Sequence, residues 1–358
     1  IYNDKKSINF VVQVIVIELQ VMEIAHCYLN GNVDAVEFCA AETSPNILAA
    51  ATYTLQGTDE PTRNGSVCIF DVNADAGHLE LLHCYETSGV FDIRWTPAGS
   101  GSETNPLLGI ACSDGQLRVH RCKGSSNGDK DPLLSEIVAE RISSSMCLCL
   151  DWSPSAASIA VGHSDGSVSV ASLSESRISK AQTRKAHDYE VWAASFDPHQ
   201  PQLVYTGSDD CKFTCWDVRE DPSNMVFQNS KVHTMGICCI SKSPQDPYRI
   251  FTGSYDEHLR VWDLRSLVKP ISKTDIRLGG GVWRIKHHPY KSDVILAACM
   301  HNGFAIVNSE GEKPLLLETY KDHKSLAYGA DWQKNGDFVA TCSFYDRLIR
   351  VWKPQVRL

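Results

Sequence analysis

Two stretches near the C-terminal end of the 358-residue chain carry side chains whose types suit chemistry. LGGGVWR holds Gly279, Gly280, Gly281 and Arg284, and AACMHNGF holds His301. Glycines let backbone N–H groups approach a ligand closely, so that they can donate to a developing oxyanion. Arg284 could bind a carboxylate through two parallel N–H groups, and the imidazole of His301 can accept a proton. The plain alternative, an irregular structural segment with a glycine turn, stays open.

Aromatic residues recur at equivalent places of the repeat described below. Two places gather several rings: Phe91, Trp192, Trp283 and Tyr328 at the start of a strand, and Tyr255 and Tyr345 just before a tight turn. A half-ring of aromatic faces can hold a quaternary ammonium group, with roughly 0.5–2 kcal/mol from each ring. Each ring could equally pack between structural units, so both interpretations stay open.

The element that must position these residues is a repeated β unit. Its three strongest copies run from a histidine to a tryptophan 29 residues later, with an aspartate six residues before the tryptophan: His187 to Trp216, His233 to Trp262 and His323 to Trp352. Weaker copies bring the repeat to seven, at spacings of 45 to 51 residues, with positions 70, 120, 171 and 307 in place of the tryptophan. Alternating apolar residues between turns predict short antiparallel strands. One such unit cannot bury both faces of its sheet, so it needs neighbours.

The His, turn Asp and terminal Trp-Asp pattern resembles the WD-repeat family. The resemblance implies an all-β fold, a seven-bladed β-propeller of four-stranded blades around a central channel. It covers residues 23–358, and residues 1–22 are expected to form an N-terminal extension outside the fold. The last blade lacks an outer strand in sequence order, so residues 24–29 are expected to fill that place and close the ring.

In WD-repeat proteins the histidine, the turn aspartate, a strand hydroxyl and the tryptophan form a buried hydrogen-bonded set. By position the resemblance implies His187, Asp210, Thr206 and Trp216 in the fourth unit, and His233, Asp256, Thr252 and Trp262 in the fifth. In the seventh unit Cys342 stands at the hydroxyl position, so that set should be weaker. The sixth unit departs from the pattern, because His301 occupies the turn aspartate position and the three glycines replace the histidine region.

The segment Gly162–Gly166 matches the nucleophile motif G-x-S-x-G, with Ser164 at its centre. That motif needs a strand-turn-helix context, whereas the repeat predicts a strand-turn-strand hairpin here. We therefore expect a structural turn.

Composition narrows the class of partner and compartment. The formal net charge of −9 disfavours a nucleic-acid surface and suits a cationic ligand or a basic partner. Many of the 14 cysteines stand in strand-like runs and no CxxC pair occurs, so reduced thiols are expected and no metal or cofactor is predicted. A cytoplasmic location without membrane contact follows from this expectation.

The segments HTMG, TGSYDEH, LGGGVWRIK, AACMHNGF, YGADW and ATCSFYDRL resemble, in this order, the diphthine methyl ester hydrolases of diphthamide biosynthesis. The resemblance implies hydrolysis of the methyl ester of diphthine, a modified histidine of translation elongation factor two, which then becomes available for amidation. The expected partners are that elongation factor and other enzymes of the pathway. Diphthine carries a trimethylammonium group, which aromatic rings can hold.

The resulting hypothesis assigns roles to particular residues. His301 with Asp209 is the predicted general base, and the Gly279–Gly281 backbone is the predicted oxyanion donor. The other predicted substrate-binding residues are Trp192, Tyr255, Trp283, Arg284, Tyr328 and Tyr345. The rival hypothesis is a non-catalytic adaptor, because the segments WDVR at 216–219 and WDLR at 262–265 resemble the WDxR box of cullin-four ubiquitin ligase receptors.

Overall fold

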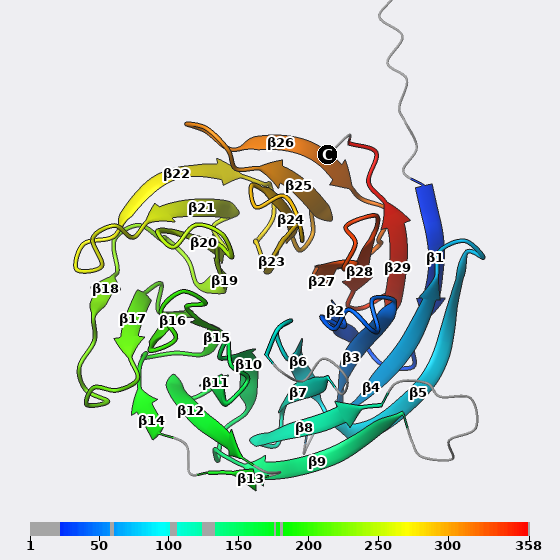
Figure 1. Cartoon of the computed structure of the whole chain (residues 1–358), viewed down its shortest axis with the longest axis horizontal. Coiled ribbons are helices and arrows are strands. Elements are labelled where there is room, and N and C mark those ends of the chain that lie inside the picture. The colour runs from blue at the N-terminus through cyan, green and yellow to red at the C-terminus, as the bar shows by residue number, and fades with distance from the viewer. Residues whose placement is uncertain are drawn as a thin grey trace, which may run out of the picture.

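The computed structural model describes residues 22–57, 61–100, 106–123, 133–174, 177–179 and 182–356. These residues form 29 strands and, within these ranges, no helix. The strands make seven antiparallel sheets, arranged as blades of a ring around a central channel (Figure 1). The prediction of a seven-bladed all-β propeller is confirmed. Residues 1–21 of the predicted N-terminal extension lie outside the described residues.

In blades one to three the strands follow chain order from the innermost strand outward. Blade one has β2 (Val33–Phe38), β3 (Ile47–Gln56), β4 (Thr62–Asn73) and β5 (His78–Ser88); blade two has β6 (Val90–Trp95), β7 (Leu107–Cys112), β8 (Gln116–Cys122) and β9 (Leu134–Arg141). Blade three has β10 (Cys147–Trp152), β11 (Ser158–His163) and β12 (Ser167–Ser174), with β13 (Arg177–Ile178) and β14 (Gln182–Lys185) both paired to β12.

The remaining four blades follow the same order. Blade four has β15 (Val191–Phe196), β16 (Leu203–Ser208), β17 (Phe213–Asp217) and β18 (Phe227–Asn229); blade five has β19 (Ile237–Lys242), β20 (Arg249–Ser254), β21 (His258–Asp263) and β22 (Ile271–Arg277). Blade six has β23 (Arg284–His287), β24 (Val294–Ala298), β25 (Phe304–Asn308) and β26 (Leu315–Tyr320); blade seven has β27 (Ala327–Trp332), β28 (Val339–Ser343), β29 (Leu348–Lys353) and β1 (Met22–Tyr28).

The burial pattern of the strands follows from the packing of one blade on the next. In blade five the second strand β20 is buried at five of its six residues, whereas the outer strand β22 alternates between exposed and half-buried residues. The apolar clusters span neighbouring blades: one joins Leu296 of blade six to Trp332 and Trp352 of blade seven. The core is therefore a set of layers between blades, which a single blade could not form alone.

The N-terminal strand closes the ring, as predicted. β1 pairs antiparallel with β29, with His26 opposite Arg350 and Tyr28 opposite Leu348. An ion pair between Arg350 and Glu23 joins the same two strands. In Figure 1, β1 lies along the outer side of β29 and completes the blade to which the C-terminal strands belong.

The buried polar set of blade four has the expected partners. His187 Nδ1 lies 3.0 Å from Asp210 Oδ1, His187 Nε2 lies 2.8 Å from Thr206 Oγ1, and Trp216 Nε1 donates to the same hydroxyl at 3.0 Å. These contacts satisfy the imidazole and the carboxylate, so His187 has a structural role here.

The sets of blades five and seven differ from the prediction. In blade five the Arg260 guanidinium stands between the two expected partners, 3.2 Å from His233 Nδ1 and 2.8 Å from Asp256 Oδ1. In blade seven the hydroxyl comes from Thr341, one residue before Cys342, and it accepts from Trp352 Nε1 at 3.1 Å. The assignment of Cys342 to the hydroxyl position was wrong, because β28 presents Thr341 rather than Cys342 to His323.

Two further expectations concern the cysteines and Ser164. Cys68 and Cys84 stand opposite each other on β4 and β5 and form a disulfide, contrary to the expectation of thiols alone, while twelve other cysteines are free. Ser164 lies in the turn between β11 and β12, where its hydroxyl accepts the Met146 N–H at 3.1 Å. The hairpin context was predicted correctly.

Candidate active site

In six of the seven blades a β-bulge interrupts the pairing at the start of the innermost strand. The pairing of the innermost strand with the second strand skips one residue in blades one to five: Asp34, Phe91, Leu148, Trp192 and Cys238. In blade seven the skipped pair begins at Tyr328. Because a bulge adds a residue to one strand only, it re-aims a side chain out of the regular alternation. We call the end of the channel at which the innermost strands begin the upper mouth.

The predicted aromatic residues meet at the upper mouth. Trp283 is the centre of the group, with ring centroids 5.3 Å from Trp192, 5.9 Å from Tyr255 and 4.8 Å from Tyr328. Trp192 and Trp283 touch across blade five, whose bulge residue is the small Cys238. Four of the predicted substrate-binding residues therefore form one aromatic surface, although their role in binding stays a prediction.

The aromatic surface continues into blades seven and one through rings that the sequence did not single out. Tyr328 lies 5.3 Å from Phe344, which lies 4.9 Å from both Tyr345 and Tyr53. Tyr53 in turn lies 4.7 Å from Phe91. Tyr53 was not predicted as a site residue, because it lies within a regular strand rather than at a repeat position. Phe344 sits in the turn beside Tyr345, so its place in the repeat could have indicated it.

A cavity of about 490 Å³ opens at the upper mouth. Trp192, Phe91 and Tyr345 line it, together with Leu148 and the charged residues Glu190 and Arg63. Tyr255, Trp283 and Tyr328 are outside the lining and support Trp192 and Phe344 from the side. The structure thus divides the predicted aromatic set into rings that face the cavity and rings that hold them in place.

Asp209 stands at the edge of this aromatic surface. A Cβ on Gly236 would lie 2.3 Å from Asp209 Oδ1 and 3.1 Å from Tyr255 Cδ2, so Gly236 allows these two side chains to approach each other. Burial raises the pKa of the Asp209 carboxyl, an effect that the Trp192 indole N–H opposes and that the neighbouring carboxylates Glu190 and Asp210 reinforce. A carboxylate here adds negative potential beside rings that could hold a cation.

The glycine bend and His301 also lie at the upper mouth. A Cβ on Gly281 would lie 2.7 Å from Met300 Sδ and 3.4 Å from Tyr255 Cα, and His301 directly follows Met300 in the turn between β24 and β25. His301 is exposed, and no described residue forms a hydrogen bond or ion pair with it. Within the described residues, no hydrogen bond or ion pair joins His301 to Asp209. A base built from both would therefore need the substrate to join them.

The glycine bend is fixed by the turn that carries His301. Asn302 Nδ2 donates to Leu278 O at 2.5 Å, and a Cβ on Gly280 would lie 2.1 Å from Cys299 O. Gly280 therefore cannot be replaced without moving the bend. Among the hydrogen bonds of the described residues, none uses the N–H of Gly279, Gly280 or Gly281 as donor. Gly279 is exposed, whereas Gly280 and Gly281 are buried.

Arg284 is already paired inside the channel. Its Nη1 lies 3.1 Å from Asp92 Oδ1, and both side chains are largely buried. Because of this pairing, Arg284 has less charge available for the carboxylate that it was predicted to bind. Arg63 lines the cavity instead, and the ion pairs of the described residues do not include it. Arg63 could not be predicted from the repeat pattern, because it belongs to no repeat position.

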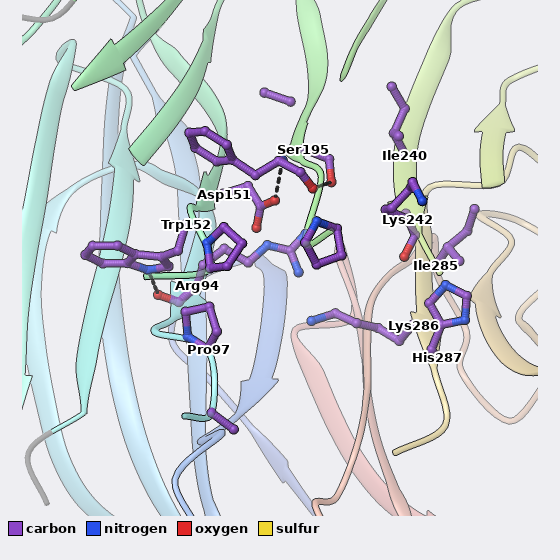
Figure 2. A pocket seen from close by; sticks show the side chains of 16 residues that line it. Arg94, Pro97, Asp151, Trp152, Ser195, Ile240, Lys242, Ile285, Lys286 and His287 are labelled. Atoms are coloured by element: carbon purple, nitrogen blue, oxygen red, sulfur yellow. Dashed lines mark hydrogen bonds between the residues drawn. The ribbon is translucent and has the colours of Figure 1, made fainter. Parts of the chain in front are cut away.

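A second cavity, of about 380 Å³, opens at the opposite end of the channel, where the innermost strands end. Figure 2 shows Arg94 and Lys286 reaching toward its centre, with Asp151 beside Ser195. Lys286 Nζ lies 2.6 Å from Glu37 Oε1, which also lies 3.3 Å from Arg94 Nη1. The cations of this lower mouth are thus neutralised by carboxylates of the chain itself. Trp152 and Phe196 also line this cavity, but the larger group of contacting aromatic rings lies at the upper mouth, which is the better candidate site.

The comparison with known proteins agrees with this architecture. The model of the family described as WD domain, G-beta repeat matches residues 179–217, 226–263 and 315–353. The "Diphthine methyltransferase homolog" of Dictyostelium discoideum is 31% identical, over 91% of this chain and 98% of its own length. The chain belongs to the diphthine methyltransferase family.

Family members with that name occur in other eukaryotes. The Homo sapiens "Diphthine methyltransferase" is 32% identical over 84% of this chain and 72% of its own length. The Schizosaccharomyces pombe protein of the same name is 29% identical over 86% and 91%. A chain of the crystal structure titled "Crystal Structure of Mitotic Checkpoint Complex" superimposes with a TM-score of 0.71 at 15% identity. The match covers 99% of this chain and 98% of that chain, and it shows a shared fold alone.

The two WDxR boxes bear on the adaptor hypothesis. The arginines of the WDxR boxes are exposed, and each pairs with the aspartate of its own box: Arg219 with Asp217 at 2.6 Å and Arg265 with Asp263 at 2.6 Å. In the part of the chain that the structure describes, no helix is long and apolar enough to span a membrane.

Proposed function

We propose that this chain hydrolyses the methyl ester of diphthine methyl ester on translation elongation factor two. Water supplies the oxygen that bonds to the acyl carbon, and the bond from that carbon to the methoxy oxygen breaks. One proton of the water goes to the methoxy oxygen, which leaves as methanol, and the other is released to solvent. The product is diphthine with a free carboxylate, ready for amidation. The observation that carries the proposal is the continuous aromatic surface beside the acidic residues Asp209 and Glu190, in a chain of the diphthine methyltransferase family.

The upper mouth supplies a group for each part of the reaction. Trp192 and its neighbouring rings offer π faces for the trimethylammonium group. The free N–H groups of Gly279–Gly281 are the proposed donors to the oxyanion of the tetrahedral intermediate. His301, assisted by Asp209, is the proposed base that activates water. Arg63 is better placed than the paired Arg284 to bind the product carboxylate.

A protein substrate requires a site that opens to solvent. A modified histidine on a folded elongation factor must enter from solvent, and the cavity at the upper mouth opens beside the exposed residue Tyr345. The face of the propeller around this mouth is therefore the proposed docking surface for the elongation factor. Such a protein substrate places the reaction in the cytoplasm.

The test is incubation of purified chain with methylated elongation factor in ¹⁸O-labelled water. We expect methanol release and one ¹⁸O atom in the diphthine carboxylate, detected by mass spectrometry. A methylated acceptor without methanol would instead identify a methyl transfer. Absence of any change in the methylated factor would overturn the proposal.

The adaptor hypothesis makes a different prediction. A cullin-four receptor would need Arg219 and Arg265 for its partner, whereas both are paired with aspartates of their own boxes. A pull-down with the ligase adaptor, run beside the methanol assay, separates the two functions.

A further inference from the structure

One of the bulge positions at the upper mouth carries a carboxyl group. Asp34 occupies in blade one the place that Phe91 occupies in blade two and Trp192 in blade four. Both of those rings line the cavity. The other described bulge residues are aromatic or apolar, or in one case a cysteine, so Asp34 is the single charged member of this layer.

The surroundings of Asp34 do not explain why a carboxyl is there. Its exposed fraction is 3%. None of the hydrogen bonds or ion pairs formed by the described residues includes its carboxyl. A buried carboxylate without a hydrogen-bond partner is destabilising by several kcal/mol, and Arg284, whose charge favours the ionised form of Asp34, is already paired with Asp92. A stability role would be better served by an apolar residue.

The other channel carboxylates have a structural role that Asp34 lacks. Each accepts a backbone N–H from the innermost strand of an adjacent blade: Glu37 from Trp95, Asp92 from Leu150, Asp151 from Phe196 and Asp331 from Phe38. These bonds tie the blades together at the hub. Asp34 makes no such bond, and the phenols of Tyr53, Tyr255 and Tyr328 lie near it instead, which sets it apart from its neighbours.

The groups that face Asp34 are mostly uncharged. They are the phenols of Tyr53, Tyr255 and Tyr328, the thiol of Cys342, and the buried pair of Arg284 and Asp92. Burial raises the pKa of the Asp34 carboxyl to about 8, with Arg284 opposing this shift and Asp92 reinforcing it. The carboxyl is therefore mainly protonated at neutral pH until a positive charge arrives.

We propose that Asp34 is the counter-charge for a quaternary ammonium group held by the aromatic rings of the upper mouth. The identity of the natural ligand, the trimethylammonium of diphthine, rests on the proposed function. The role of Asp34 is to distinguish a fixed cation from a neutral group of the same shape, because rings alone also bind apolar groups. On binding, the carboxyl loses its proton to solvent and the carboxylate remains beside the cation.

The first test uses choline and its neutral isostere 3,3-dimethylbutan-1-ol, titrated into the full chain and followed by NMR. We expect the wild type to bind choline roughly tenfold more tightly than the alcohol. In Asp34→Asn the two affinities should become similar. Asp151→Asn is the control, since it removes a buried carboxyl at the opposite mouth and should leave the preference for choline unchanged.

The second test counts protons and needs only the wild-type chain. Calorimetric titration of choline at pH 7, in two buffers that differ in ionisation enthalpy, should show release of close to one proton per choline bound. At pH 9.5 the release should vanish, because Asp34 is then already ionised. This readout remains valid if Asp34→Asn does not fold.

The outcomes separate this inference from the proposed function. Unchanged choline preference in folded Asp34→Asn, or no proton release at pH 7, would overturn the role of Asp34 even if the chain releases methanol from its substrate. Loss of choline binding in Asp151→Asn alone would overturn it too, by placing the site at the lower mouth. Choline selectivity without methanol release would leave Asp34 as a cation-binding residue and defeat the hydrolase.

Discussion

Trp192 and Trp283 should respond differently to the same substitution, although the sequence treats them as equivalent. Trp192 lines the cavity and contacts one aromatic ring, Trp283. Trp283 is outside the lining and contacts three rings. Replacement of each by leucine therefore separates binding of the cation from support of the aromatic surface.

The expected magnitudes follow from these contacts. Trp192→Leu removes one cation–π face, worth about 0.5–2 kcal/mol, which weakens cation binding by roughly 2- to 30-fold. It also removes one ring pair, worth about 0.5–1.5 kcal/mol of stability. Trp283→Leu removes three ring pairs, so its loss of stability should be about three times larger, roughly 1.5–4.5 kcal/mol.

The assay combines choline titration with urea unfolding of the same variants. Trp192→Phe and Trp283→Phe are the matched controls, because each keeps an aromatic face and should recover most of the lost affinity or stability. The reasoning fails if Trp283→Leu weakens choline binding more than Trp192→Leu while its unfolding free energy stays at the wild-type value.

Three further predictions address catalysis, the channel and pH. His301→Ala should lower the rate of methanol release by about 10²- to 10⁴-fold, the range for a lost general base. The melting temperature should not change, because His301 is exposed and forms no hydrogen bond. His78→Ala, at another exposed histidine, provides the control, and full activity of His301→Ala would refute the assignment. Arg284→Met should lower the free energy of unfolding by about 1–3 kcal/mol, because the buried Asp92 carboxylate then keeps only Arg94 and the Leu150 N–H as partners. A normal unfolding curve with a raised KM would instead indicate direct substrate binding. Burial lowers the pKa of His163 and His323 to about 4 and that of His233 to about 3, so the unfolded chain binds more protons than the native one below pH 6.5. The stability that these histidines contribute is then fully present above that pH. It should fall by about 1.4 kcal/mol per pH unit for each such histidine as the pH drops toward 4. Thermal unfolding between pH 7 and pH 5 measures this, and a melting temperature independent of pH would contradict it.

The sequence by itself determined the repeat and its consequences. The spacing from histidine to tryptophan is local, and so is the alternation of apolar residues, so both are visible along the chain. They were enough to predict seven blades, the closing strand that ends at Tyr28, and the shared position of Phe91 and Trp192. The departure of the sixth unit also marked the part of the hub where Gly281 and Met300 meet.

The tertiary structure decided which of these groups are free. Asp92 neutralises Arg284, and Arg260 enters the buried set of blade five, in each case through a neighbour that the repeat pattern does not specify. Asp34 lies on a strand that begins far from Tyr255 and Tyr328 in sequence, yet the ring brings all three to one mouth. Charge, burial and pairing depend on side chains contributed by different blades, and the closing of the ring is what places those side chains together.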